Sequence, residues 1–231
     1  IRVGHAWLRL AIKLQASREQ TRSRHVDSWW STVTSPTRVL IASSARAGGT
    51  WLYNLCRLLY LHSGRQVYSA WIDDYSSEDS RDYHVIKTHR PEPITFSVSH
   101  IIVSHRPLIE RMASLVRMGF VSPERQSVRS RATVERQLSD YWWQCADLIV
   151  PFDQILTAPV VAAENVANLL ELDFRPEPLR AVVDELLDLK TPAAGSFDQI
   201  TLLHPGHVAS NEDREVFLKM VEPWLEGLCD E

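Results

Sequence analysis

Three short segments of the chain combine basic, small or imidazole side chains at points where apolar runs end. In residues 43–51 (Ser-Ser-Ala-Arg-Ala-Gly-Gly-Thr-Trp), an arginine and two glycines precede an apolar helical stripe. Small residues let a backbone close tightly around an anion, and the free N–H groups at the start of a helix point toward it. The segment predicts a phosphate-binding turn, and a purely structural turn is the alternative interpretation.

The second segment, residues 102–107, ends an apolar run with Arg106, and Ser114 follows eight residues later. Arginine binds phosphate through charge-assisted hydrogen bonds. The two side chains reach one phosphate only if the following helix folds back over the site. The segment therefore predicts a second anion site, with a surface salt bridge of Arg106 as the alternative.

The third segment, residues 85–91, places Lys87 and His89 at the end of another apolar run. Histidine has an ordinary pKa of about 6.5 and accepts a proton near neutral pH. His89 is the predicted general base. His84 and His105, also near expected strand ends, are the alternatives.

The elements expected to position these segments alternate between strands and helices. Short β-branched runs predict strands at 38–42, 83–87, 100–104 and 147–152, and apolar stripes predict helices at 50–60, 133–145, 161–170, 179–187 and 214–228. Pro107 is expected at the first position of one more helix, and residues 210–213 have the spacing of a capping box. The alternation indicates a single α/β domain with a central parallel sheet flanked by helices, whose ligands bind at the carboxyl ends of strands.

Charge is distributed unevenly along the 231 residues. Their net charge is −4, yet residues 1–136 carry 20 basic and 11 acidic side chains, and 21 of the 25 basic residues are arginine. Arginine suits planar phosphate contacts, so the first half favours an anionic partner. Residues 1–37 are expected to form a basic N-terminal helix and lead-in that packs on the domain, with a membrane-surface helix as the alternative, and residues 38–231 form the domain itself.

Composition excludes several classes of protein. With 45% hydrophobic and 23% charged residues, the chain is not collagen-like, coiled-coil or disordered. Its three cysteines are too widely spaced to indicate a disulfide framework or a zinc site, so a reducing, cytoplasmic compartment is expected. No apolar run is long enough to cross a membrane. A signal or anchor upstream of Ile1 stays open.

The three segments together resemble the PAPS-dependent sulfotransferases, where PAPS is 3′-phosphoadenosine 5′-phosphosulfate. Residues 45–52 resemble the family's 5′-phosphosulfate loop, usually P-[K/R]-S-G-T-T-W-L. Residues 102–107 with Ser114 resemble its 3′-phosphate site, and residues 85–91 its K-T-H-x-P segment, in which the histidine is the catalytic base. The resemblance implies a P-loop-like sulfotransferase fold, closer to the cytosolic small-molecule type.

Weaker similarities extend the resemblance over roughly residues 38–228. Residues 195–197 resemble the T-S-F segment that contacts adenine, and residues 204–207 fall where the family has R-K-G. Three departures stand out: Arg46 replaces the usual lysine, residues 204–207 lack the Arg-Lys pair, and Phe152 lacks the hydroxyl of the family's usual tyrosine.

The resemblance implies transfer of a sulfuryl group from PAPS to a hydroxyl, less readily an amine, with 3′,5′-ADP (PAP) as product. It implies a small-molecule acceptor rather than a protein or polysaccharide, and neither a metal nor a nucleic acid. His89 would take the acceptor's proton while Arg46 and Lys87 stabilise the transferring group. The residues implied to bind the nucleotide are Arg46, Ala47, Gly48, Gly49, Thr50, Trp51, Arg106, Ser114, Phe197 and Gly206.

Two other functions remain open. A P-loop nucleotide or small-molecule kinase requires magnesium and a lysine where this chain has Gly49. A catalytically inactive nucleotide-binding module of the same fold is the other alternative, and the altered segment 204–207 favours it.

The sequence leaves the identity of the acceptor open. The arginine-rich segment 117–136 is interpreted as a mobile gate, a site for an anionic acceptor or a solvated loop that leads into a helix. Four aromatic residues either line an acceptor pocket or pack in the core: Trp71, Tyr75, Trp142 and Trp143. The oligomeric state stays open.

Overall fold

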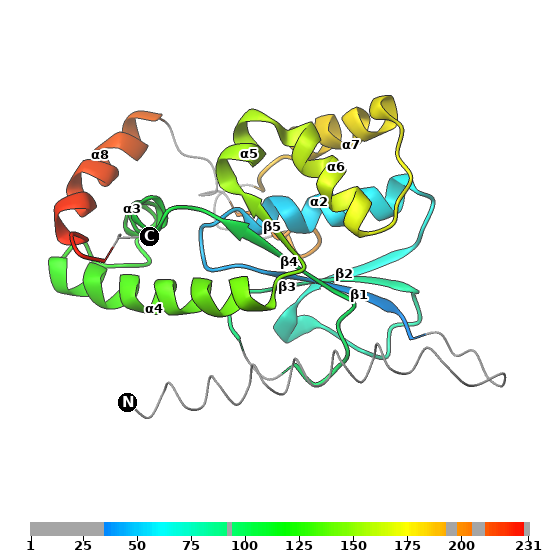
Figure 1. The fold of residues 1–231 in the computed structure, drawn as a ribbon, viewed down its shortest axis with the longest axis horizontal. Coiled ribbons are helices and arrows are strands. Elements are labelled where there is room, and N and C mark those ends of the chain that lie inside the picture. The colour runs from blue at the N-terminus through cyan, green and yellow to red at the C-terminus, as the bar shows by residue number, and fades with distance from the viewer. Residues whose placement is uncertain (1–34, 92–93, 193–197, 205–210, 229–231) are drawn as a thin grey trace.

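The central element is a five-stranded parallel sheet, seen in a computed structural model that describes residues 35–91, 94–192, 198–204 and 211–228 (Figure 1). The strands are β1 (Thr37–Ala42), β2 (Val67–Trp71), β3 (Tyr83–Thr88), β4 (His100–His105) and β5 (Leu148–Pro151), in the order β2-β3-β1-β4-β5. Ala42 pairs with Thr88, and Ile41 with Ile102, so β1, β3 and β4 end beside one another. The α/β fold with a central parallel sheet is confirmed.

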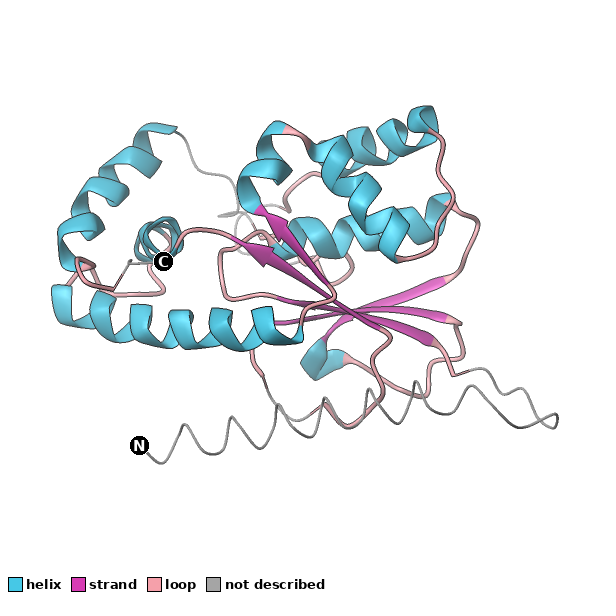
Figure 2. Ribbon diagram, viewed as in Figure 1, coloured by secondary structure: helices cyan, strands magenta, loops and turns pink. Residues whose placement is uncertain are grey.

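Helices cover both faces of the sheet (Figures 1 and 2). One face carries α2 (Gly49–His62), α5 (Phe152–Thr157), α6 (Pro159–Leu169) and α7 (Pro176–Asp188). The other carries the second half of α4 (Arg125–Cys145). Beyond the sheet, α3 (Leu108–Arg117) packs against α8 (Asn211–Val221) and the start of α4.

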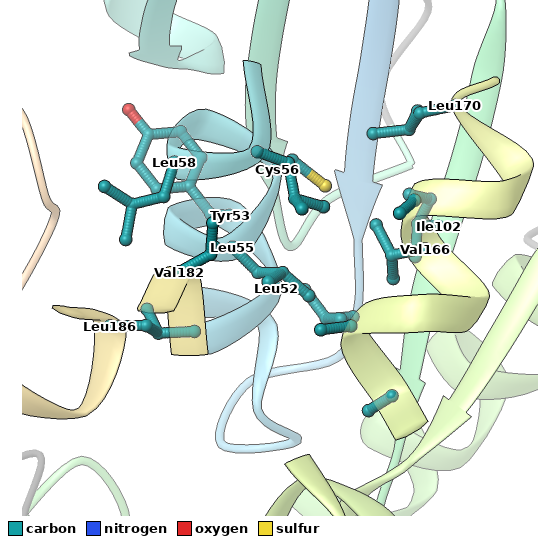
Figure 3. Close-up of a cluster of buried hydrophobic side chains, with 14 of the residues drawn as sticks. Leu52, Tyr53, Leu55, Cys56, Leu58, Ile102, Val166, Leu170, Val182 and Leu186 are labelled. Carbon is teal, nitrogen blue, oxygen red and sulfur yellow. The ribbon is translucent and has the colours of Figure 1, made fainter. Parts of the chain in front are cut away.

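The main core forms because side chains alternate along each strand. Val39 and Ile41 of β1 pack beneath α2, whereas Leu40 and Ala42 face Trp142 of α4. Figure 3 shows the α2 side, where the apolar stripe predicted for this helix meets side chains of β4, α6 and α7. This packing fixes the start of α2 above the end of β1, which is the position of the predicted phosphate turn.

A smaller core joins α3, α4 and the C-terminal segment. Met112, Leu115, Val128, Val221 and Leu225 are buried in it. The 3-10 turn η3 (Glu222–Trp224) follows α8, and the helix ends on the flank of α4. This cluster positions α3, and therefore Ser114, against the loop that follows β1.

The segment 125–136 is helical, and residues 118–124 form the loop that leads into it, so the expected helix start is what was wrong. Helix α4 begins at Arg125, eight residues before the predicted start. Arg129 donates to the carbonyl of Trp224 over 2.8 Å, and Arg136 to that of Leu228 over 3.2 Å. Arg131 pairs with the carboxylate of Glu135. These arginines hold the C-terminal segment and their own helix, which argues against a gate or an anionic acceptor site there.

One strand was not predicted, and the boundaries of two other elements were predicted wrongly. The edge strand β2 was not predicted, because it is only partly buried and its apolar alternation is weak. Phe152 begins α5 instead of ending a strand, and Pro107 is the N-cap of α3 instead of its first residue. The capping serine Ser210 and residues 1–34 of the expected N-terminal helix lie outside the described residues. Among the described helices, none has both the length and the apolar character needed to span a membrane.

Candidate active site

The loop between β1 and α2 has the backbone shape of an anion cradle. Arg46 has a φ of 65° and Gly48, the N-cap of α2, a φ of 106°. A Cβ at Gly48 would lie 3.0 Å from the Phe152 ring, so both the backbone angle and the space require glycine. At Gly49 a Cβ would make only ordinary contacts. The first N–H groups of a helix lack carbonyl partners four residues back and can bind an anion, and in α2 the Trp51 N–H donates to the Gly48 carbonyl over 3.0 Å.

Buried polar contacts hold this loop from beneath. The Ser43 hydroxyl accepts a 2.8 Å hydrogen bond from the Ser104 N–H of β4. The Ser44 hydroxyl accepts one from the Arg111 guanidinium, whose Nη1 lies 3.6 Å from the carboxylate of Glu135. Arg111 and Glu135 are almost fully buried. The sequence interpretation missed this pair. The available signal was Arg111 itself, which lies on the apolar stripe of α3.

Lys87, at the end of β3, is buried and donates to the Thr50 hydroxyl at the start of α2. Burial, followed by the charge of Arg46, lowers the pKa of Lys87 to about 7. The predicted lysine and the predicted loop therefore meet, and the lysine's proton is loosely held in the free protein.

His89 follows β3 by one residue, and its Nδ1 lies 2.7 Å from the carbonyl oxygen of Ser43. A carbonyl only accepts, so Nδ1 carries the proton and Nε2 is left as an acceptor. Burial lowers the pKa of His89 to about 3, and the charges of Lys87 and Arg46 add to the effect. In the free protein this imidazole is therefore neutral near pH 7.

The two alternative histidines lie elsewhere. His84 is fully buried near the start of β3, where its Nδ1 is 2.8 Å from the Tyr75 hydroxyl and its Nε2 is 2.9 Å from the Arg81 carbonyl. His105 packs against Trp143 with ring centroids 4.6 Å apart. Of the three candidates, His89 is the one that lines the cavity described below.

The two predicted anion segments converge. Arg106 donates from Nη1 to the carbonyl oxygen of Arg46 over 3.1 Å, and Arg46 donates from Nε to the Ser114 hydroxyl over 2.9 Å. The Arg106 guanidinium also lies 4.3 Å from the centroid of the Phe152 ring. Helix α3 therefore folds back over the loop, as the spacing of Arg106 and Ser114 requires.

Sequence reasoning missed further charged residues beside this pair. The carboxylate of Glu110 accepts hydrogen bonds from both Arg106 and Arg214, the latter on α8. Burial, with Arg117 and then Arg106, lowers the pKa of Arg46 to about 10. The spacing of Arg106 and Glu110, one helical turn, was a readable signal. Nothing in the sequence indicated Arg214, because it lies 104 residues from its partner.

The β1–α2 loop and the ends of β3 and β4 border a cavity of about 640 Å³, a volume within the range for small-molecule sites. Three basic side chains, Arg46, Lys87 and Arg106, line it together with the neutral His89. Its other lining residues are mainly apolar and aromatic: Ala45, Gly48, Gly49, Thr50, Trp51, Asn54, Trp71, Asp74, Met118, Phe120, Phe152, Leu186, Leu189, Leu202, Leu203 and His204.

The predicted nucleotide-binding residues divide into three groups. Six line the cavity: Arg46, Gly48, Gly49, Thr50, Trp51 and Arg106. Ser114 and the buried Ala47 lie behind the lining. Phe197 and Gly206 lie outside the described residues, as do residues 205–207. Trp51 lines the cavity and also packs against the main core, so it fits both interpretations of this residue.

Of the four aromatic residues considered for the acceptor, Trp71 lines the cavity. Trp142 is fully buried beneath the sheet, Tyr75 is hydrogen-bonded to Arg38 and His84, and Trp143 packs on His105. A shared aromatic pocket of these four residues is therefore wrong. In the part of the chain that the structure describes, no group of three or more His, Cys, Asp or Glu side chains is placed to hold a metal ion.

Comparison with known proteins adds to this geometry. No protein-family model matches the chain, and no curated protein matches it in sequence. Among solved structures, the chain is similar to mouse sulfotransferase SULT7A1 complexed with PAP. The TM-score is 0.54 at 11% sequence identity, over 82% of this chain and 85% of that chain. The chain has a sulfotransferase-like fold.

Proposed function

We propose that this protein is a PAPS-dependent sulfotransferase that transfers a sulfuryl group to the hydroxyl of a small acceptor and releases PAP. The observation that carries the proposal is the meeting of the two predicted anion segments and a neutral histidine at one cavity. Arg46, Lys87 and Arg106 supply its positive charge, and His89 presents an unprotonated Nε2. The likeness in fold to a PAP-complexed sulfotransferase supports the same donor.

The donor's two phosphate-bearing ends match the two anion segments. The β1–α2 loop and Lys87 would hold the 5′-phosphosulfate, because the loop offers helix N–H groups and Lys87 a buried cation. Arg106 and Ser114 would hold the 3′-phosphate. Arg214 and Arg117 would add the charge that residues 204–207 do not provide. Trp51 would present its ring to the adenine.

The reaction needs one proton transfer and one displacement. His89 Nε2 takes the proton of the acceptor hydroxyl as its oxygen bonds to sulfur. The bond between sulfur and the bridging oxygen of the 5′-phosphate breaks at the same time. Arg46 and the start of α2 stabilise the charge that develops on that oxygen, and Lys87 stabilises the sulfuryl oxygens.

The low pKa of His89 is a property of the free site. Burial is its first cause, and Lys87 and Arg46 contribute through their positive charges. A bound polyanion neutralises these two cations and raises the pKa of His89 toward its ordinary value. His89 is therefore a stronger base with the donor bound than in the free site.

A P-loop kinase fits the site less well. In such kinases the hydroxyl at the start of the helix coordinates magnesium, and a lysine of the loop reaches the phosphates. Here the ammonium group of Lys87 lies against the Thr50 hydroxyl, and a divalent cation at the same hydroxyl would meet its repulsion. The loop itself has Gly49 where the kinases have lysine.

Thermal unfolding with PAP and with ATP-Mg distinguishes the candidate functions. A ligand at 100 times its Kd adds roughly 2.7 kcal/mol to the free energy of unfolding, a readily measured rise in Tm. We expect PAP to raise the Tm and ATP-Mg to leave it unchanged, and sulfate from radiolabelled PAPS to appear on hydroxyl acceptors. A Tm rise with ATP-Mg alone would indicate a kinase. PAP binding without transfer to any acceptor would indicate an inactive nucleotide-binding module.

A further inference from the structure

The cavity extends past His89 to an aromatic wall. Strand β2 ends at Trp71, and the 3-10 turn η1 (Ile72–Asp74) follows it. The Trp71 ring lies edge-on to His89, with centroids 5.2 Å apart and planes at 72°. Lys87 Nζ lies 5.7 Å from the centroid of the same ring. Trp71, Lys87 and His89 all line the cavity, so an indole ring lies directly beside the proposed base.

Two neighbouring contacts fix the orientation of Trp71. Its indole Nε1 donates to the Asp73 carboxylate over 3.1 Å. Arg90 Nη2 lies 2.7 Å from each oxygen of that carboxylate. Arg90 follows His89 in the chain, so the aromatic wall is tied to the segment that carries the base. The pairing with Arg90 also offsets the charge of Asp73.

Asp74 differs from Asp73 in its surroundings. The backbone carbonyl of Asp74 accepts a hydrogen bond from the Tyr68 hydroxyl, which fixes the turn. Asp74 is exposed and is one of the residues that line the cavity. Among the described residues of the lining, Asp74 is the acidic one. The acceptor end of the cavity therefore combines an aromatic face with a negative charge.

We propose that the acceptor is a hydroxyl-bearing aromatic amine, with its ring on Trp71, its hydroxyl at His89 Nε2 and its ammonium group at Asp74. The inference rests on the proposed function and names the acceptor class of the same site. Indole faces attract cations as well as aromatic rings, and a carboxylate favours an ammonium over a neutral or anionic group. The arginines of α4 oppose this preference only weakly: Arg129, Arg131 and Arg136 bind protein groups, and the charge of Arg131 is the smallest of the causes that lower the pKa of His89.

Three phenols test the proposal. Their para substituents carry a positive charge in tyramine, no charge in 4-ethylphenol and a negative charge in 3-(4-hydroxyphenyl)propionate. With PAPS as donor we expect kcat/KM to fall in that order. Because Asp74 is exposed, the advantage of tyramine over 4-ethylphenol is about fivefold at low salt. It shrinks in high salt, since exposed ion pairs are screened.

Asp74→Asn provides the decisive variant. It should bring the tyramine to 4-ethylphenol ratio close to one, chiefly by lowering kcat/KM for tyramine. Glu78→Gln, which removes an exposed acid of the same loop that does not line the cavity, is the matched control and should keep the ratio. Trp71→Leu should lower kcat/KM for all three phenols while the Tm rise with PAP is retained, and Trp71→Phe should restore part of the loss.

The outcomes separate this inference from the proposed function. Sulfation of the phenols without a charge preference, or a preference that survives Asp74→Asn, overturns the inference and leaves the sulfotransferase intact. Transfer to aliphatic alcohols alone also overturns the inference. Failure to bind PAP and to transfer sulfate to any acceptor overturns both.

Discussion

The carbonyl of Ser43 fixes the proton of His89 on Nδ1, so one imidazole nitrogen is available to receive the acceptor's proton. Replacing His89 by alanine should lower kcat by about 10²- to 10⁴-fold, the usual contribution of a general base. The Kd for PAP, measured by calorimetry, should stay within a few-fold, because His89 carries no charge in the free site. His62→Ala, a surface histidine paired with Glu185, is the control and should retain full activity. Undiminished turnover by the His89 variant would remove this residue from the mechanism.

Lys87 gives nucleotide binding a pH dependence of predictable sign. Its pKa in the free protein is lowered to about 7, by burial and then by Arg46. A bound polyanion favours the ammonium form, so above pH 7 the complex holds more protons than the free protein. PAP affinity should therefore fall as the pH rises above 7, by up to about tenfold per pH unit. The ligand's own phosphates do not cause this slope, because their second pKa is about 6.

Calorimetric titration of PAP between about pH 7 and pH 9 measures this slope. Titrations in two buffers of different ionisation enthalpy should also show proton uptake on binding. Lys87→Met should bind PAP more weakly and lose the slope. A pH-independent affinity in the unsubstituted protein would mean that Lys87 does not meet the anion.

At the scale of the elements, Gly48 links the loop to α5. A side chain there would be strained by the φ of 106° and would lie 3.0 Å from the Phe152 ring. Gly48→Ala should lower the free energy of unfolding by about 1–2 kcal/mol, the cost of a left-handed backbone, and the Tm by about 2–8 °C. Gly49→Ala is the matched control and should not destabilise the protein, because alanine is the better helix former and has room there. Equal Tm values for the two variants would contradict this account of the loop.

Helix α8 carries Arg214, which donates to the carboxylate of Glu110. The same carboxylate accepts a hydrogen bond from Arg106, which lines the cavity. Arg214→Ala should weaken PAP by about fivefold, the equivalent of roughly 1 kcal/mol for a partly exposed charge. Its effect on AMP, which lacks the 3′-phosphate, should be small. Lys219→Ala, on the exposed side of α8, should change neither Kd. An equal loss for PAP and AMP would place Arg214 away from the 3′-phosphate.

Some of the elements could be predicted from the sequence and others could not. The ends of β1, β3 and β4 were predictable because each strand is a short buried run followed at once by polar, chemically distinctive residues. The early start of α4 was not predictable, because Arg129 and Arg131 are expected to face solvent until their carbonyl and carboxylate partners are known. Partnerships across 60 to 104 residues, such as Arg106 with Arg46 and Arg214 with Glu110, are set by packing and have no local signature.

At the scale of the whole molecule, the parallel sheet places the three motifs at one edge. Because β3 and β4 flank β1, the loop, the base and the strand-terminal arginine meet although they lie some 60 residues apart in the chain. The sequence predicted this meeting from the fold class alone. It did not indicate what supports the loop from the opposite side, since that contact involves α3 and α4.

That support is the buried pair of Arg111 and Glu135 under Ser44. Its contribution to the position of the loop can be measured apart from its contribution to the free energy of unfolding. Removing one partner of a buried ion pair usually costs about 3–5 kcal/mol, whereas apolar replacement of both is often neutral. Glu135→Leu should therefore strongly lower the free energy of unfolding in urea, and adding Arg111→Met should recover most of the loss.

PAP binding should not recover in this double variant, because Ser44 has lost the guanidinium that holds the loop. A stable double variant with a weakened Kd for PAP assigns the pair to positioning the loop. If the double variant binds PAP as tightly as the unsubstituted protein, the loop is held by Ser43 and Ser104 without help from α3. Since Arg111 is also bonded to the Arg106 carbonyl, loss of the pair should weaken PAP more than AMP.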